Sequence, residues 1–183
     1  MTELDLHLES FEDRLLKSKL VTFEGRIGEG GFAIVWKGTY FNKTCAIKLQ
    51  NYIHQRDGED EYNESKIMRE LNSVKILKHP NITEFYTSYL GRKSILLFME
   101  LMDHDLETYL EKKDLSEKKC KTIYKQIASG LLYCHRKGIA HCDVKEENVL
   151  INKEETICKL TDFGLSKYFY SKKTGEKVYF YSV

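Results

Sequence analysis

A polar segment bracketed by apolar residues, "GIAHCDVKEENVLI" at 138–151, concentrates side chains that are well suited to chemistry. Asp143 and Asn148 could place a carboxylate near a hydroxyl nucleophile and an amide oxygen on a metal ion. Lys145, which lies between them, could neutralise a phosphoryl group. The same letters also suit a polar surface turn, because aspartate and asparagine side chains cap turns. The segment alone leaves both interpretations open.

A glycine-rich stretch, "GEGGFAIV", lies between two expected strands and could cradle phosphates. Glycine lets a backbone approach a ligand closely. Tight hairpins use glycine for structural reasons as well, so Gly28, Gly30 and Gly31 are by themselves a weak signal. A dinucleotide-binding fingerprint is excluded, because that fingerprint opens a helix and here a strand follows.

Lys48 occupies an alternate position of the apolar strand "CAIKL", where a lysine usually faces solvent. An ion pair with Glu70 on the following helix would instead hold it ready for phosphate oxygens. Glu61 and Glu64 are also available as partners, so the pairing with Glu70 is one of three.

Asp162 follows an apolar strand and precedes Phe163-Gly164. The position suits a metal-ligating carboxylate beside a flexible joint, and it equally suits an ordinary exit from a strand.

Hydrophobic periodicity predicts the elements that must position these residues. The expected strands are 21–31, 32–40, 43–50, 81–90, 93–101, 148–151 and 156–161, and the expected helices are 4–17, 58–77 and 116–137. The first five of these strands enclose the helix at 58–77, and helical segments follow them. This order predicts two lobes with a crevice between them.

Composition narrows the class of protein. The net charge of +1, with 31% charged residues, gives no reason to expect binding to nucleic acid or to a membrane surface. No apolar run approaches the length of a bilayer-crossing helix. The five cysteines form no CxxC pair, which argues against a disulfide framework or a zinc site and favours reduced thiols in the cytoplasm or nucleus.

The order of these stretches resembles the eukaryotic protein kinases. "GEGGFAIV" is similar to the glycine-rich loop of that family, "CAIK" to its third-strand lysine motif, "HCDVKEEN" to its H-R-D-x-K-x-x-N catalytic loop, and "DFG" is unaltered. "MRELNSVKILKHPNI" resembles the αC helix and the turn after it, which singles out Glu70 as the partner of Lys48.

The resemblance implies an α+β, two-lobe kinase fold. The expected domains are a helical extension at 1–20, a five-stranded N-lobe with the αC helix at 21–101, and a partial helical C-lobe at 102–183. It also implies ATP and Mg²⁺ as cofactors and a protein as substrate. Lys145, two positions after Asp143, matches the serine/threonine branch of the family.

The resemblance further implies a role for each site residue. Asp143 and Lys145 are the expected catalytic residues, and Asn148 and Asp162 are the expected Mg²⁺ ligands. The residues expected to bind ATP are Gly28, Glu29, Gly30, Gly31, Phe32, Val35, Ala46, Lys48, Glu70, Met99, Glu100, Met102 and Leu150. Val74, Phe85, His141 and Phe163 are expected to stack as a spine.

Three positions depart from the family pattern. Cys142 stands where many kinases carry an arginine that binds a phosphorylated activation loop, which predicts activity independent of that phosphorylation. Ala33 replaces the third glycine, and Glu146 replaces a common proline.

The last ten residues, "TGEKVYFYSV", match the family's G-T-x-x-Y-x-A-P-E segment only loosely. We therefore expect a C-terminally incomplete kinase domain, with Ile123, Ile127 and Leu131 left uncovered and available for self-association. One interpretation is a fragment of an active kinase. Another is a truncated, non-catalytic protein that binds ATP and regulates a partner kinase. A complete small enzyme is the interpretation that the sequence favours least.

Overall fold

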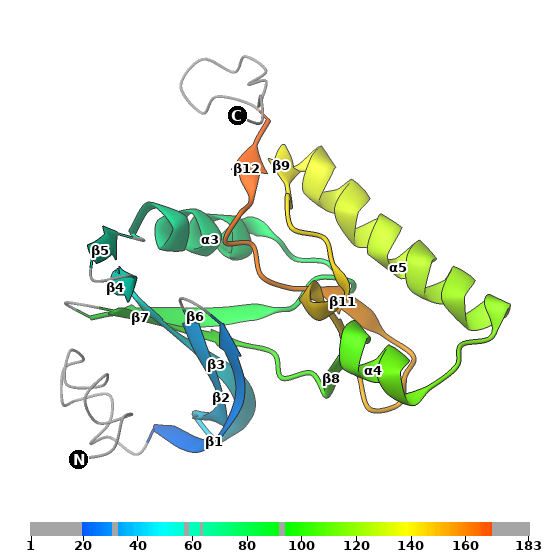
Figure 1. The fold of residues 1–183 in the computed structure, drawn as a ribbon, viewed down its shortest axis with the longest axis horizontal. Helices are drawn as coiled ribbons and strands as arrows, with labels where there is room; N and C mark the ends of the chain where they lie inside the picture. Colours follow the sequence, from blue (N-terminus) through cyan, green and yellow to red (C-terminus); the bar gives the residue numbers. More distant parts are fainter. Residues whose placement is uncertain (1–19, 31–32, 57–58, 63, 92–93, 170–183) are drawn as a thin grey trace. The chain divides into compact units, whose positions relative to one another are not determined.

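The computed structural model describes residues 20–30, 33–56, 59–62, 64–91 and 94–169 (Figure 1). The predicted helix at 4–17 and the stretch at 174–183 lie outside these residues. The chain divides into two compact units, and the division falls within helix α3 (Glu64–Ile76). Unit 1 comprises Met1–Leu71 and Phe85–Leu101, and unit 2 comprises Asn72–Glu84 and Met102–Val183.

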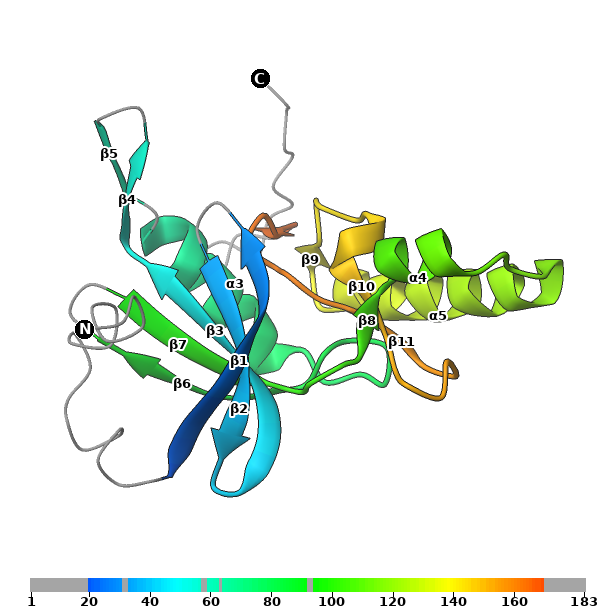
Figure 2. The same ribbon diagram turned by 60° about the horizontal axis from the view of Figure 1, so that its bottom comes forward.

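Unit 1 contains the five-stranded antiparallel sheet that the sequence predicts, in the order β1-β2-β3-β7-β6 (Figure 2). Its strands are β1 (Val21–Gly30), β2 (Ala33–Tyr40), β3 (Lys43–Asn51), β6 (Phe85–Leu90) and β7 (Ser94–Met99). These segments are rich in β-branched and aromatic residues, which pack well on a pleated surface.

The two faces of this sheet bury separate clusters, because successive side chains of a strand point to opposite sides. One cluster contains Cys45, Ile47 and Leu49 of β3, together with Val21, Leu96 and Phe98. The other contains Ile95 and Leu97 of β7 with Ile67 and Leu71 of α3. Strand β3 is buried on both faces from Cys45 to Gln50, although Lys48 and Gln50 on the face toward α3 are polar.

The predicted helix at 58–77 is wrong in its first part. Strands β4 (Ile53–Arg56) and β5 (Glu59–Tyr62) pair as an antiparallel hairpin, and α3 begins only at Glu64. Figure 2 shows this hairpin beyond the end of β3. The sequence between the strands is Asp57-Gly58, a dipeptide that favours two-residue hairpin connections.

Unit 2 combines helices with small sheets. Its elements are β8 (His104–Asp105), α4 (Leu106–Lys112), α5 (Glu117–Arg136), β9 (Ile139–Ala140), the 3₁₀ turn η1 (Glu146–Asn148), β10 (Val149–Ile151), β11 (Cys158–Leu160) and β12 (Lys167–Tyr168). The backbone N–H of Lys119 donates to the Ser116 hydroxyl, so α5 begins at the position that the sequence predicts. None of the helices in the described part of the chain is long and apolar enough to cross a membrane.

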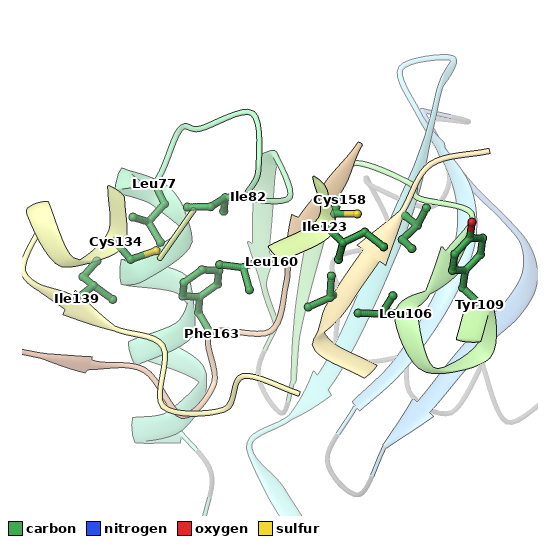
Figure 3. Packing of buried hydrophobic residues seen from close by; sticks show 12 residues of the cluster. Leu77, Ile82, Leu106, Tyr109, Ile123, Cys134, Ile139, Cys158, Leu160 and Phe163 are labelled. Atoms are coloured by element: carbon green, nitrogen blue, oxygen red, sulfur yellow. The ribbon is translucent and has the colours of Figure 1, made fainter. Parts of the chain in front are cut away.

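The core of unit 2 corrects one expectation. Ile123 is only 3% exposed and lies within a buried cluster (Figure 3). Ile127 and Leu131 are half-buried and pack against the same cluster, so this face of α5 is largely covered. The covering elements are β9 and β11, which contact α5 within the unit. At Gly130, α5 packs so closely against Asn81 and Leu160 that only glycine fits. An added Cβ would lie 2.8 Å from the Asn81 carbonyl oxygen and 3.0 Å from Leu160 Cδ1.

Candidate functional site

The predicted ion pair is formed within unit 1. Lys48 Nζ lies 2.8 Å from Glu70 Oε1, and both side chains are buried. Lys48 is carried by β3 and Glu70 by α3, which covers this face of the sheet. Glu64, one of the alternative partners, is exposed. Because burial weakens solvent screening, this pair is held more firmly than a surface ion pair.

Gln50 is a buried polar residue beside the Lys48–Glu70 pair, and it was not identified from the sequence. Its Nε2 donates to Glu70 Oε2 at 2.8 Å, and its side chain is buried. The signal that could have found it is its spacing, because residues two apart on a strand share a face.

The first residues of the glycine-rich stretch, 28–30, form the end of β1 and pair with the start of β2. Gly28 lies opposite Val35, Glu29 opposite Ile34, and Gly30 opposite Ala33. An added Cβ at Gly28 would only make ordinary contact with Val35, at 3.7 Å. Packing among the described residues therefore does not demand glycine at this position. Glu29 is exposed and forms an ion pair with Arg26, and Gly31 and Phe32 lie outside the described residues.

The other residues expected to bind ATP are divided between the units. Val35, on β2, is directly opposite Lys48, and Ala46 is opposite Met99, so these side chains belong to adjacent strands of unit 1. Glu100 follows β7 in the same unit. Met102 and Leu150, both half-buried, belong to unit 2.

Within unit 2, Asp143 and Asn148 are joined by two hydrogen bonds. The amide nitrogen Nδ2 of Asn148 donates to the backbone oxygen and to Oδ2 of Asp143, each at 2.8 Å. The turn η1 folds the chain back so that residues five apart meet, and its backbone bond runs from Asn148 to the Lys145 carbonyl at 3.0 Å. The Asn148 amide oxygen accepts no hydrogen bond from the described residues, which leaves it available for a cation.

His141 connects this segment to the chain before Asp162. Its ring is 1% exposed, with Nε2 2.9 Å from the Thr161 carbonyl oxygen and Nδ1 3.3 Å from the Asp143 nitrogen. These partners require a neutral imidazole that donates from Nε2 and accepts at Nδ1. Burial lowers the pKa of His141, which favours the same form. The polar segment is held at both ends by the buried side chains of His141 and Asn148, which is consistent with its buried apolar flanks.

Asp162 has φ 58°, a left-handed conformation that non-glycine residues adopt rarely. Its Oδ1 accepts from the Gly164 nitrogen at 3.2 Å. The neighbouring Thr161 donates from its backbone nitrogen to the Asn148 carbonyl oxygen at 3.0 Å. The two predicted metal ligands are thus tied together through the backbone of Thr161. Such a conformation at a constrained aspartate is typical of functional sites.

Lys145 is exposed, and its ammonium lies 3.1 Å from Glu147, a partner that sequence reasoning did not consider. The hydrogen bond that Lys145 donates to Glu147, the negative charge of Glu147, and the charges of Asp143 and Asp162 raise the pKa of Lys145. The side chain therefore stays a cation at neutral pH.

Parts of the predicted spine are also in place. The His141 and Phe163 rings are 4.6 Å apart between centroids, and Val74 packs against the cluster that contains Phe163. Phe85 packs in unit 1, against the cluster of Ile67 and Leu71.

Comparison with known proteins gives the family. A family model described as "Protein kinase domain" matches residues 21–182. The chain is 33% identical over 148 residues to the probable serine/threonine-protein kinase fhkB of Dictyostelium discoideum, covering 80% of this chain and 13% of that protein. It is 36% identical over 145 residues to the protein kinase domain-containing protein ppk9 of Schizosaccharomyces pombe, covering 78% of this chain and 26% of that protein.

The chain thus corresponds to a minor part of the length of both relatives. The family match spans nearly all of it and includes both units, with the five-stranded antiparallel sheet and the three helices of the described residues. The kinase fold predicted from the order of the motifs is confirmed. The chain belongs to the protein kinase family.

Proposed function

We propose that this protein is an ATP-dependent protein serine/threonine kinase, which transfers a phosphoryl group from Mg-ATP to a protein hydroxyl. The observation that carries the proposal is the pair of hydrogen bonds from Asn148 to Asp143. They hold a carboxylate beside an amide whose oxygen is left for a metal ion. A carboxylate that accepts a hydroxyl proton, next to a metal ligand, is the arrangement that phosphoryl transfer from ATP requires.

In this proposal most of the nucleotide contacts come from the 21–101 lobe. Lys48, held by Glu70, contacts the α- and β-phosphates, and the backbone amides from Gly28 to Phe32 cover the phosphates. The remaining nucleotide contacts are assigned to Val35, Ala46 and Leu150 on the adenine ring, Met99 at the back of the pocket, and the backbones of Glu100 and Met102.

The 102–183 lobe carries the groups that act on the hydroxyl. Asp143 orients the substrate hydroxyl and accepts its proton, because its Oδ2 is fixed by Asn148 and its N–H is bound to His141. Lys145 offers a positive charge to the transferring group, and its present partner Glu147 is on the surface, where exchange of partners has a small cost.

The donor atoms fit Mg²⁺. Among the described residues no three His, Cys, Asp or Glu side chains gather as metal ligands. Mg²⁺ usually takes only one or two carboxylates from the protein, with waters and substrate phosphates completing its shell. Asn148 and Asp162 would supply hard oxygen ligands of this kind. When bound, the ion would neutralise charge on the phosphate oxygens.

Calorimetric titration of the chain with ATP, with and without Mg²⁺, tests nucleotide binding. We expect metal-dependent binding that weakens in Lys48→Met and in Asn148→Ala. Folding of each variant is checked by circular dichroism. A folded chain that binds no nucleotide in the presence of Mg²⁺ would refute the proposal.

Phosphoryl transfer is tested separately with radiolabelled ATP. Peptides that differ only in carrying serine, threonine or tyrosine should be labelled on serine or threonine, and Asp143→Asn should abolish labelling. Labelling of the tyrosine peptide alone would contradict the serine/threonine assignment. Nucleotide binding without transfer would favour the non-catalytic alternative, a protein that regulates a partner kinase.

A further inference from the structure

The Glu70 carboxylate takes hydrogen bonds from two residues of β3. Its Oε1 accepts from Lys48 Nζ and its Oε2 accepts from Gln50 Nε2, each at 2.8 Å. Lys48 and Gln50 lie two apart on one strand, so both side chains leave the sheet on the face that α3 covers. Each oxygen of the carboxylate therefore has its own donor from the same strand.

The surroundings of this carboxylate make both donors necessary. Glu70 is 2% exposed and Gln50 is 7% exposed. Leu97 and Ile95, directly opposite Lys48 and Gln50 on β7, are fully buried. A carboxylate oxygen without a donor is costly in such apolar surroundings. An amide supplies the second donor without adding charge, so the Lys48–Glu70 pair keeps its net neutrality.

The orientation of the Gln50 amide is set by Glu70. Its Nε2 faces the carboxylate, while its buried Oε1 accepts no hydrogen bond from the described residues. The reverse orientation would bring an oxygen against the Glu70 oxygen, which is repulsive. The bond to Glu70 is therefore retained although the other end of the amide is left unpaired.

We propose that Gln50 is a positioning residue for the phosphate-binding lysine. By holding Oε2 it prevents the Glu70 carboxylate from rotating, so that Oε1 stays directed at the Lys48 ammonium. This inference rests on the phosphate-binding role proposed for Lys48. It assigns to Gln50 an effect on nucleotide affinity that is exerted through its hydrogen bond to Glu70.

The test variant is Gln50→Met, which removes the donor and nearly preserves the volume. The matched control is Leu49→Met, which perturbs the opposite face of the same strand. We expect Q50M to weaken Mg-ATP binding about threefold to tenfold. The lost hydrogen bond is made to Glu70, which in turn holds Lys48, and not to the nucleotide itself. We expect L49M to leave the affinity unchanged.

A double-mutant cycle separates positioning from a general structural effect. In a Lys48→Met background, Q50M should cause no further loss of Mg-ATP affinity, because the residue through which it acts is gone. An equal loss in both backgrounds would overturn the proposal, and so would a Q50M chain with the affinity of the unsubstituted protein.

A measurement without nucleotide keeps this inference distinct from the proposed function. In the ¹H–¹⁵N spectrum of lysine ammonium groups, the buried Lys48 signal, assigned by its absence in K48M, should be sharp in the unsubstituted chain and L49M. In Q50M it should broaden as exchange with water accelerates. This result would support the positioning role even if the unsubstituted chain bound no Mg-ATP. An unchanged Lys48 signal in folded Q50M would overturn it.

A second variant provides the same test if Q50M does not fold. Gln50→Asn keeps the polarity of the amide but is shorter by one methylene group, so it cannot reach Glu70 from the same backbone. It should reproduce both the loss of affinity and the broadened Lys48 signal. If neither variant folds, Gln50 is a structural residue and the proposal is wrong.

Discussion

The hydroxyl oxygens of Ser73 and Ser166 lie 2.8 Å apart, and both side chains are fully buried. Ser73 belongs to the last turns of α3, and Ser166 follows Phe163-Gly164. The Ser166 nitrogen also donates to the Phe163 carbonyl oxygen at 3.0 Å. Within unit 2, this contact fixes the chain after Asp162 to the end of the helix.

The two single substitutions of this pair should together cost more than the double substitution. Ser73→Ala or Ser166→Ala leaves one buried hydroxyl unpaired, and each should lower the free energy of unfolding by about 1–3 kcal/mol. The double variant should lose much less than the sum, because no polar group is left without a partner. Urea denaturation of all four proteins measures the cycle. Strict additivity would mean that the two hydroxyls do not interact.

Gly130→Ala should destabilise the protein although alanine is the better helix former. The gain in helix propensity is about 1 kcal/mol. The new methyl group would lie 2.8 Å from the Asn81 carbonyl oxygen, and the resulting overpacking typically costs about 1–3 kcal/mol. Gly25→Ala is the matched control, because an added Cβ there meets no atom within 4 Å. A thermal melt in which G130A gains stability would show that α5 can move away from its neighbours.

Stability should fall when His79 is forced to take up a proton. Its Nδ1 accepts from the Asn81 nitrogen at 3.1 Å, and its ring stacks on Tyr133 with centroids 5.0 Å apart. Burial lowers the pKa of His79 below the ordinary 6.5. The unfolded chain therefore binds the proton more readily, so this contribution is complete above pH 6.5 and is lost as the pH falls through the folded pKa.

His79→Asn provides the comparison, because asparagine can accept from the same backbone nitrogen without titrating. Urea midpoints are compared at about pH 7.5 and about pH 5.5, on either side of the ordinary histidine pKa. The unsubstituted protein should lose more stability between these two values than H79N. His141 is retained in both proteins, and its pKa is also lowered, so its contribution cancels. Equal losses would show that His79 titrates normally in the folded chain.

Phosphorylation of residues 165–182 should have little influence on any kinase activity. Cys142 occupies the position of the phosphate-binding arginine, and it is exposed, with φ 65°. A thiol cannot form the charge-assisted bonds through which arginine grips a phosphate. Phosphatase treatment, and Cys142→Arg with and without it, should change phosphoryl transfer little. A large loss after phosphatase in the unsubstituted protein would contradict this prediction.

The elements that the sequence predicted well are those with a strong local pattern. The sequence correctly placed the apolar face of α5 and its cap at Ser116. It also placed the strands of unit 1, which are rich in β-branched and aromatic residues. The hairpin β4-β5 was missed because "IHQRDGEDEY" has no apolar alternation and its charged residues resemble the start of a helix. Its pairing is visible only in the backbone hydrogen bonds.

Long-range contacts set the limit of prediction at the site. The residues by themselves offered three glutamates for Lys48, and only the family resemblance singled out Glu70, the partner that the packing of α3 on the sheet provides. The expectation that Ile123 is uncovered was wrong because residues well beyond α5 in the sequence, including Cys158 and Leu160 of β11, belong to the same buried cluster. The bridge from His141 to Thr161 joins residues whose separation gives no sequence signal at all.

Having asparagine rather than aspartate at position 148 also limits the number of titrating groups beside Asp143. Its amide nitrogen is 2.8 Å from a carboxylate oxygen of Asp143, a separation at which two carboxylates could not both be ionised. An aspartate in its place would have to share a proton with Asp143, and the charge offered to a cation would then vary with acidity. An amide does not titrate. The oxygen that Asn148 offers to a cation is therefore the same at every pH that a cell experiences.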